Sequence, residues 1–275
     1  MKPAAFDYVR AQHLDEALDV LKQQGGEARV IAGGQSLLPM LNMRLAKPAV
    51  LVDVMGIPGF GEIRREGDAI VVPAGVRQAK LLARLGLATE QPLLAAALPW
   101  VGHYQTRARG TVCGSTAHAD PSAEIPLCLV ALDGEIRLRS RKKRRSLKAS
   151  EFFTGMMVTD KAEDELIEAV AFPAAVKGAG YAFREVARRH GDFAIVACAA
   201  MATADAIHVA VGAVADRPER RSYPLLEGSA LDDALNAFAW ELDARDDIHA
   251  TARLRRDLVR SLGREVIEEA LRCRA

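Results

Sequence analysis

The sequence predicts an α+β protein of two domains, and three observations support this fold class. Residues 1–56 alternate strand and helix patterns, which is typical of a small α/β lobe, and the pattern changes from about residue 57. A glycine-containing segment, residues 177–180, is a plausible boundary. Beyond it, strand patterns come first and helix patterns follow, which favours a separate α+β domain. We therefore expect domains at 1–175, with lobes at about 1–56 and 57–175, and at 176–275.

In the first lobe, Leu14, Leu18 and Leu21 recur at helical spacing. This spacing predicts a helix over 15–24, which the glycine pair at 25–26 ends. Short apolar runs predict strands at 6–9, 29–32 and 50–54.

The second lobe contains a basic run, residues 137–145, that resembles a nucleic-acid patch. Its apolar residues alternate with charges and no aromatic residues are interleaved, so an exposed hairpin tip is the favoured interpretation. The other predicted strands are 63–65, 69–73, 135–139 and 144–147, and the predicted helices are 78–85, 92–101 and 125–129. The last domain is expected to contain strands at 181–187, 193–203 and 207–214 and helices at 230–242 and 250–272.

Composition excludes several classes of protein. Half of the 275 residues are hydrophobic, which argues against disorder, and the formal net charge of +1 argues against a general polyanion-binding role. No stretch is long and uncharged enough to span a bilayer, and the N-terminus lacks the apolar core of a signal peptide, so we expect a cytoplasmic protein. The four cysteines show no iron–sulfur spacing, so no cluster is expected on this chain.

The segment from Arg29 to Leu38 runs from an apolar strand through two glycines into a leucine-rich stretch. Glycine lets backbone N–H groups approach an anion closely, and Ser36 is expected to cap the helix that follows. By itself this pattern is more often only a tight turn.

A second segment, from Arg109 to Pro126, collects small residues, hydroxyl groups and two carboxylates with almost no bulky side chains. Such a run is unsuited to a core strand. It suits a loop against a bulky ligand, with amides and hydroxyls for phosphates and a carboxylate for a ribose. Two segments of this kind predict a large dinucleotide.

Other catalytic patterns are absent from the sequence. There is no G-x-G-x-x-G after a strand, no P-loop and no H-E-x-x-H, and His118 beside Asp120 is the only metal-like proximity. No spacing indicates a nucleophile with its base. We therefore expect no catalytic residue and no metal ligand, and the chemistry should come from a bound cofactor.

The two segments together resemble the FAD-binding medium subunit of molybdenum hydroxylases, the group of xanthine dehydrogenase and carbon monoxide dehydrogenase. Three further pieces agree in order along the chain, at 51–54, 151–155 and 183–194. The resemblance covers essentially the whole chain. It implies a two-lobed FAD-binding domain of the PCMH type, similar to vanillyl-alcohol oxidase, followed by a smaller C-terminal α+β domain.

The resemblance also implies roles for particular residues. Glu124 falls where a carboxylate meets the ribose, Asp120 either does the same or caps a turn, and Arg184 matches a position that approaches the flavin. Relatives often have glycine where this chain has Cys113, which would be strained by about 1 kcal/mol or more if φ is positive there. The expected cofactor-binding residues are Arg29, Ile31, Ala32, Gly33, Gly34, Gln35, Ser36, Leu37, Thr111, Val112, Cys113, Gly114, Ser115, Ala119, Asp120, Glu124 and Arg184.

The function implied is that of an electron-transfer subunit with non-covalent FAD. It would receive electrons from two [2Fe–2S] clusters of a small subunit, beside a large molybdopterin subunit, in a heterotrimer or a dimer of heterotrimers. The external acceptor and the organic substrate are left open. Two alternatives stay open as well, a stand-alone FAD-dependent oxidase of the same fold and a non-redox nucleotide-binding module.

Overall fold

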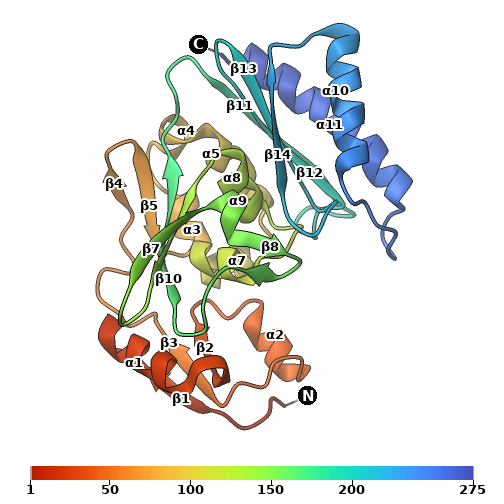
Figure 1. Cartoon of the computed structure of the whole chain (residues 1–275). Coiled ribbons are helices and arrows are strands. Elements are labelled where there is room, and N and C mark those ends of the chain that lie inside the picture. Colours follow the sequence, from red (N-terminus) through yellow and green to blue (C-terminus); the bar gives the residue numbers. More distant parts are fainter. Residues whose placement is uncertain (1, 275) are drawn as a thin grey trace.

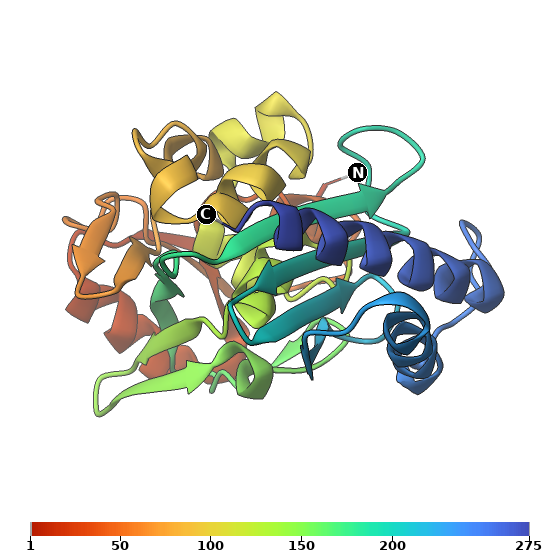
Figure 2. The same cartoon turned by 90° about the horizontal axis from the view of Figure 1, so that it is seen from above.

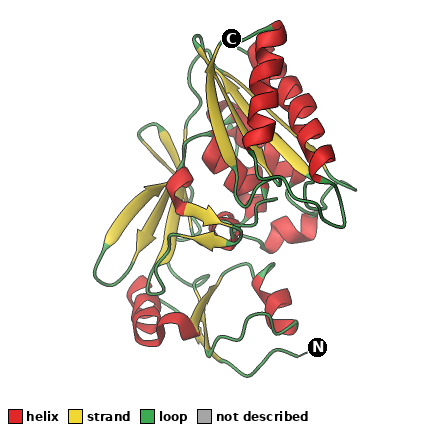
Figure 3. Ribbon diagram, turned by 45° about the vertical axis from the view of Figure 1, so that its right-hand side comes forward, coloured by secondary structure: helices red, strands yellow, loops and turns green. Residues whose placement is uncertain are grey.

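The computed structural model describes residues 2–274, which form three sheet-based bodies in sequence order (Figure 1). The N-terminal lobe lies at one end, a five-stranded sheet with short helices lies in the middle, and a four-stranded sheet with two long helices lies at the other end (Figures 1 and 3). The fold class expected from the sequence, an α+β protein with a two-lobed first domain and a smaller C-terminal domain, is confirmed.

The N-terminal lobe is built on a parallel sheet of order β1-β3-β2. Its helix α1 buries Leu18 and Leu21 against this sheet, and Gly25, with φ of +50°, ends the helix at the predicted place. A second helix, α2, follows β2 directly. The bounds are β1 Asp7–Arg10, α1 Leu14–Gln24, β2 Ala28–Ile31, α2 Leu37–Asn42 and β3 Val50–Asp53.

The middle lobe is an antiparallel sheet of order β4-β5-β10-β6-β7. Helix α7 packs against β5 and β10, and α8 packs against α5 and α7. The strands are β4 Arg64–Glu66, β5 Ala69–Pro73, β6 Glu135–Arg139, β7 Arg144–Lys148, β8 Phe153–Gly155, β9 Val158–Thr159 and β10 Leu166–Pro173. The helices are α3 Gln78–Leu82, α4 Leu87–Glu90, α5 Pro92–Ala97, α6 Tyr104–Arg109, α7 Val112–His118, α8 Glu124–Ala131 and α9 Ala149–Phe152.

The C-terminal sheet is an antiparallel meander of order β11-β12-β13-β14. Helix α11 packs along β11 and β12 on one face, which Figure 2 shows from above, while α5 and α8 of the middle lobe contact the sheet from the other side. The sheet therefore closes over helices of the preceding domain. The bounds are β11 Gly180–Val186, β12 Val196–Ala202, β13 Ala206–Gly212, β14 Glu219–Pro224, α10 Gly228–Glu241 and α11 Ala252–Arg272.

The basic run forms the β6–β7 hairpin, as predicted. Its tip also contacts the N-terminal lobe, since Arg141 forms ion pairs of 2.7 Å with Asp15 and 2.8 Å with Asp19 of α1. These contacts place the two lobes side by side at this edge of the molecule.

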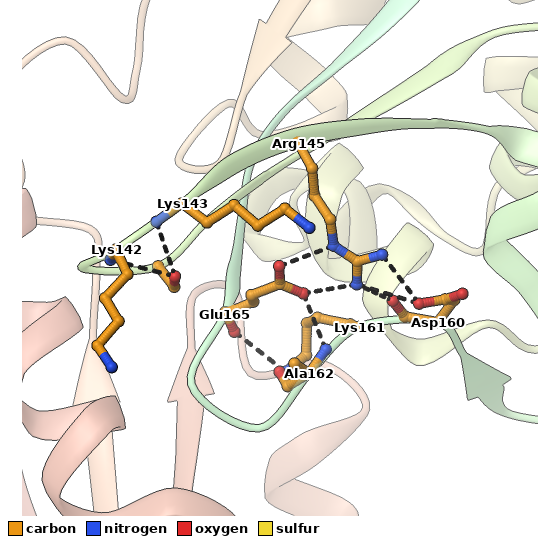
Figure 4. A network of polar contacts seen from close by, with 8 residues as sticks. Lys142, Lys143, Arg145, Asp160, Lys161, Ala162 and Glu165 are labelled. Carbon is orange, nitrogen blue, oxygen red and sulfur yellow. Dashed lines mark hydrogen bonds and ion pairs between the residues drawn. The ribbon is translucent and has the colours of Figure 1, made fainter.

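Arg145 on β7 holds the loop that precedes β10 (Figure 4). Its guanidinium group bonds Glu165 at 2.8 Å and Asp160 at 3.0 Å, and it holds the pKa of the Glu165 carboxyl below its usual range. Lys161 in the same loop donates to the carbonyl oxygen of Ala162 at 2.8 Å. The arginine therefore has a structural role, and its charge is compensated within the chain.

Several elements differ from the sequence expectation, and two of them have a clear physical reason. The helix expected over 92–101 is α only to Ala97 and continues as a 3-10 turn at Leu98–Trp100, where Pro99 lacks the N–H that the helix would need. Strand β14 has no apolar run in its sequence ERRSYP and is an edge strand with only partly covered side chains. Hydrophobic periodicity cannot detect such a strand.

Candidate functional site: a two-loop glycine cradle

The turn after β2 has the tight geometry expected of the first glycine segment. Gly34 has a φ of +69°, and a Cβ atom there would lie 3.0 Å from Leu38 Cδ1. The carbonyl oxygen of Gly34 accepts from the N–H of Leu38 at 3.0 Å, and the Gln35 side chain donates to the carbonyl oxygen of Gly33 at 3.0 Å. Ser36 makes no side-chain bond to α2, so the predicted serine cap is wrong. Backbone bonds close the turn instead.

The second segment lies directly against the first. A Cβ atom on Gly33 would overlap the carbonyl oxygen of Arg109 and lie 2.7 Å from Gly110 Cα. Gly110 is itself fixed, because its carbonyl oxygen accepts from the N–H of Gln78 at 2.8 Å and its N–H donates to Thr106 at 2.7 Å. The structure thus brings together two segments that are far apart in the sequence, and glycine is required where they touch.

The segment expected to be a loop contains a helix, α7. Thr111 is its N-cap, with the hydroxyl oxygen accepting from the N–H of Gly114 at 3.0 Å, and the N–H of Val112 donates to Val76 at 3.1 Å. The loop expectation is wrong because small residues do not by themselves make the backbone irregular. Here they let the helix pack closely against β5 and β10.

Cys113 lies within α7, and its φ is not positive, so its backbone does not carry the expected strain. Its thiol is buried, lies 3.3 Å from the carbonyl oxygen of Val72, and has its pKa raised by burial to about 12. Any contact with a ligand would therefore come from its backbone. The left-handed residue of this segment is Ala119, with φ of +53°, at the end of α7.

Asp120 acts as a turn cap, which is one of the two roles expected for it from the sequence. Its Oδ1 accepts from the N–H of Ser122 at 2.9 Å, and its carbonyl oxygen accepts from Ala123 at 3.1 Å. The turn meets the C-terminal domain, since the carbonyl oxygen of Pro121 accepts from the N–H of Ala213 at 2.8 Å. A ribose contact by Asp120 stays a prediction.

Glu124 begins α8 and is only 7% exposed. Burial raises the pKa of its carboxyl group to about 7. Its own backbone N–H and the more distant Arg107 oppose this shift, while Asp120 adds to it. A carboxyl group in this state changes its charge close to neutral pH.

The structure places Arg184 away from the cradle-bearing domain. Its side chain forms a 2.6 Å ion pair with Glu269 of α11, on the outer face of β11. The next residue, Glu185, faces the other way and is 9% exposed. The alternation from Tyr181 onward places Glu185 on the inner face of β11.

Ser115 lies in α7, where its N–H donates to the carbonyl oxygen of Thr111 at 3.1 Å, and the other expected residues lie around the first turn. The Arg29 side chain folds back on the chain, donating to the carbonyl oxygens of Gly26 at 2.8 Å and Ala28 at 2.9 Å. Ile31 ends β2, and Ala32 and Leu37 flank the turn.

Two surface hollows lie elsewhere, by the strands of the five-stranded sheet. The larger, of about 510 Å³, is lined by arginines and glutamates such as Arg137 and Glu66, which pair with each other at 2.6 Å. Among residues 2–274, no three histidine, cysteine or acidic side chains gather closely enough to hold a metal ion. No helix in the same range could cross a membrane.

Comparison with known proteins decides the family. Residues 4–175 match the model of the FAD binding domain in molybdopterin dehydrogenase, and residues 181–270 match the CO dehydrogenase flavoprotein C-terminal domain. The chain belongs to the FAD-binding medium subunits of the molybdenum hydroxylases. The residues present fit this cofactor, because Gly33 allows the two glycine segments to lie in direct backbone contact, and such segments can offer backbone N–H groups to a pyrophosphate with no bulky side chain between them.

Similar proteins include two from Paenarthrobacter nicotinovorans. The nicotine 6-hydroxylase medium subunit is 36% identical over 98% of this chain and 99% of that protein. The 6-hydroxypseudooxynicotine dehydrogenase complex subunit alpha is 35% identical over 98% and 96%. Among solved structures, reconstituted CO dehydrogenase from Oligotropha carboxidovorans superposes with a TM-score of 0.95 at 28% identity, covering 99% of this chain and 100% of that one. Quinoline 2-oxidoreductase from Pseudomonas putida 86 gives 0.92 at 33% identity, covering 99% of both.

Proposed function

We propose that this chain is the FAD-carrying electron-transfer subunit of a molybdenum-containing hydroxylase. It would bind FAD non-covalently, receive electrons from [2Fe–2S] clusters of a partner subunit and deliver them to an external acceptor. The contact between Gly33 and the Arg109–Gly110 backbone carries this proposal, because it forms the two-sided phosphate cradle from this chain's own residues. The names of the relatives, medium subunits of nicotine 6-hydroxylase and CO dehydrogenase, support it.

In this proposal the backbone from Gly33 to Ser36 holds the pyrophosphate from one side, and the first turn of α7 after Thr111 holds it from the other. Glu124 follows α7 in the chain, as the first residue of α8, and would meet the polyhydroxyl part of the cofactor. The flavin, when bound, supplies the exchange between one-electron and two-electron carriers. The chain's part is to bind and orient the cofactor and to cover it with the C-terminal domain.

The assembly is proposed on the same basis. We expect a small [2Fe–2S] subunit and a large molybdopterin subunit, in a heterotrimer or a dimer of heterotrimers, located in the cytoplasm. The four cysteines are all free thiols, which suits a reducing compartment. We also propose domain limits of 1–175 and 176–275, because the matched family models cover residues 4–175 and 181–270.

The test is direct. The purified full chain should be yellow, and denaturation should release intact FAD into the filtrate, where mass spectrometry identifies it. Flavin that stays attached to the denatured protein, or FMN in place of FAD, would contradict the proposal. A colourless chain that cannot be loaded with FAD would favour a module that binds another nucleotide.

A further inference from the structure

The β6–β7 hairpin carries positive charge that the chain compensates only in part. Residues 137–145 include seven arginines and lysines, although the whole chain has a formal net charge of +1. Three of them each pair with two carboxylates at 2.6–3.1 Å, namely Arg137, Arg141 and Arg145. The other four have no carboxylate oxygen of residues 2–274 closer than 3.8 Å, and these are Arg139, Lys142, Lys143 and Arg144.

The fold holds these four cations close together at the tip of the hairpin. Arg139 and Arg144 are directly opposite each other on β6 and β7, and like charges in this position repel each other. Lys142 and Lys143 lie in the turn, and neither ammonium group has a bonding partner within the described chain (Figure 4). A carboxylate from outside the chain would therefore stabilise this tip.

The backbone of the turn is fixed before any partner binds. The N–H groups of Lys142 and Lys143 donate to the Ser140 hydroxyl oxygen at 3.4 Å and 3.2 Å, and the Ser140 N–H donates to the carbonyl oxygen of Lys143 at 2.9 Å. Arg141, in the same turn, is anchored on α1. An ordered turn loses little conformational entropy on binding, which favours a docking role.

A hollow of about 510 Å³ begins at Arg144 and extends over the strands beside it. Its lining is mixed, with four arginines beside two glutamates and a serine. The two glutamates would repel the continuous phosphate backbone of a nucleic acid, and the lining offers no aromatic ring on which a base could stack. A protein surface can place carboxylates against the arginines and donors against the glutamates, so the mixed lining favours a protein.

The position of the tip narrows the choice of partner. A symmetric contact with a second copy of this chain would bring two cationic tips together, which is unfavourable. A [2Fe–2S] subunit that delivers electrons has to approach the cradle, which continues into α2. The tip lies beside α1, and α1 and α2 are on opposite sides of the N-terminal sheet in both Figure 1 and Figure 3.

We propose that the hairpin tip, residues 139–144, and the adjoining hollow form a docking surface for a carboxylate-rich face of the large molybdopterin subunit. This proposal rests on the proposed function, which supplies that subunit. It adds the surface through which the large subunit binds and the charge that this subunit presents there. Because the uncompensated charges are exposed, they should act mainly on the rate of association.

The test measures association of the FAD-loaded full chain with the purified large subunit by biolayer interferometry, at about 0.05 M and about 0.5 M salt. The variant Lys142→Gln, Lys143→Gln, Arg144→Gln removes three exposed charges and keeps the backbone bonds of the turn. At low salt its association rate constant should be about tenfold lower than that of the wild type. The difference should shrink at high salt, because salt screens exposed charges.

The control variant removes the same charge from exposed positions elsewhere that have no ion pair within residues 2–274, through Lys47→Gln, Lys177→Gln and Arg253→Gln. It should associate like the wild type, and all three proteins should contain the same amount of FAD. An unchanged rate in the tip variant, or an equal loss in the control, would overturn the proposal. Loss of association with the [2Fe–2S] subunit alone would overturn it too, as would DNA binding by the wild type that only the tip variant lacks. A wild type that binds no FAD would instead refute the proposed function, so the two failures are distinguishable.

Discussion

Close backbone contact at Gly33 is the most specific feature of the site at the scale of a residue. The atoms that a Cβ would meet belong to the backbone of Arg109 and Gly110, so no rotamer change could relieve the overlap. The sequence indicated a glycine pair and its anion-binding chemistry. It could not indicate that a segment about eighty residues later lies against it, because that contact depends on how the lobes pack.

We predict that Gly33→Ala lowers FAD affinity by at least about tenfold, because the two loops must separate. Fluorescence quenching of FAD on titration measures the affinity, and far-UV circular dichroism shows whether the chain remains folded. Gly61→Ala is the matched control, because a Cβ there meets nothing within 4 Å. Unchanged affinity in the Gly33 variant would refute the cradle.

Glu185 also makes stability depend on pH. Its pKa in the folded chain is raised from 4.5 to about 8, so the folded state binds the proton more tightly than the unfolded state does. The contribution of Glu185 to the free energy of unfolding is then fully present below about pH 4.5 and is lost as the pH rises through about 8.

Glutamine does not titrate, so the Glu185→Gln variant should not lose this contribution as the pH rises. The free energy of unfolding of the variant, relative to that of the FAD-free wild type, should therefore be higher at alkaline than at acidic pH, by about 1–3 kcal/mol. Urea unfolding at about pH 5 and about pH 9 measures this difference. If the variant and the wild type lose stability equally with pH, Glu185 does not titrate in the way described.

Among the elements, α7 shows where reasoning from composition fails. Its sequence VCGSTAH contains residues of weak helix propensity, and only the cap at Thr111 and the packing against β10 make it helical. By contrast, α1 was predicted to within one residue, because its leucines repeat at helical spacing and a glycine ends it. Helix α7 also buries one face, at Val112, Cys113 and Thr116, but this face carries no large apolar side chains, so no strong hydrophobic periodicity marks it in the sequence.

The cap leads to a prediction for α7. Thr111→Val removes the hydroxyl that accepts from Gly114 and should lower the free energy of unfolding by about 0.5–2 kcal/mol. It should also weaken FAD binding, though less than Gly33→Ala does. Thr111→Ser keeps the hydroxyl and serves as the control in urea unfolding and FAD titration. A Thr111→Val variant as stable as the wild type would show that packing alone holds the helix.

At the scale of the whole molecule, the family resemblance identified the fold and the cofactor domain, while the arrangement of the parts came from the structure. The turn at Pro121 bonds to Ala213 of the C-terminal sheet, and Glu185 lies in the same interface. The resemblance implies that Arg184 approaches the flavin, and this stays a prediction. In the structure its side chain pairs with Glu269 of α11, on the face of β11 opposite to Glu185, because a shift of one residue along a strand changes the face.

The last prediction concerns the assembly. If this chain is the electron-transfer subunit proposed above, the substrate is oxidised on another subunit of the complex. We expect that an organic substrate does not rapidly bleach the flavin of the isolated chain. Bleaching should appear once the [2Fe–2S] and molybdopterin subunits are added, because electrons then reach the flavin through the clusters. Stopped-flow absorbance on the isolated chain and on the reconstituted complex measures both cases, with the complex of a Gly33→Ala chain as the control that should lack the flavin signal. Rapid bleaching by substrate with this chain alone would replace the subunit assignment with that of a free-standing flavin oxidase.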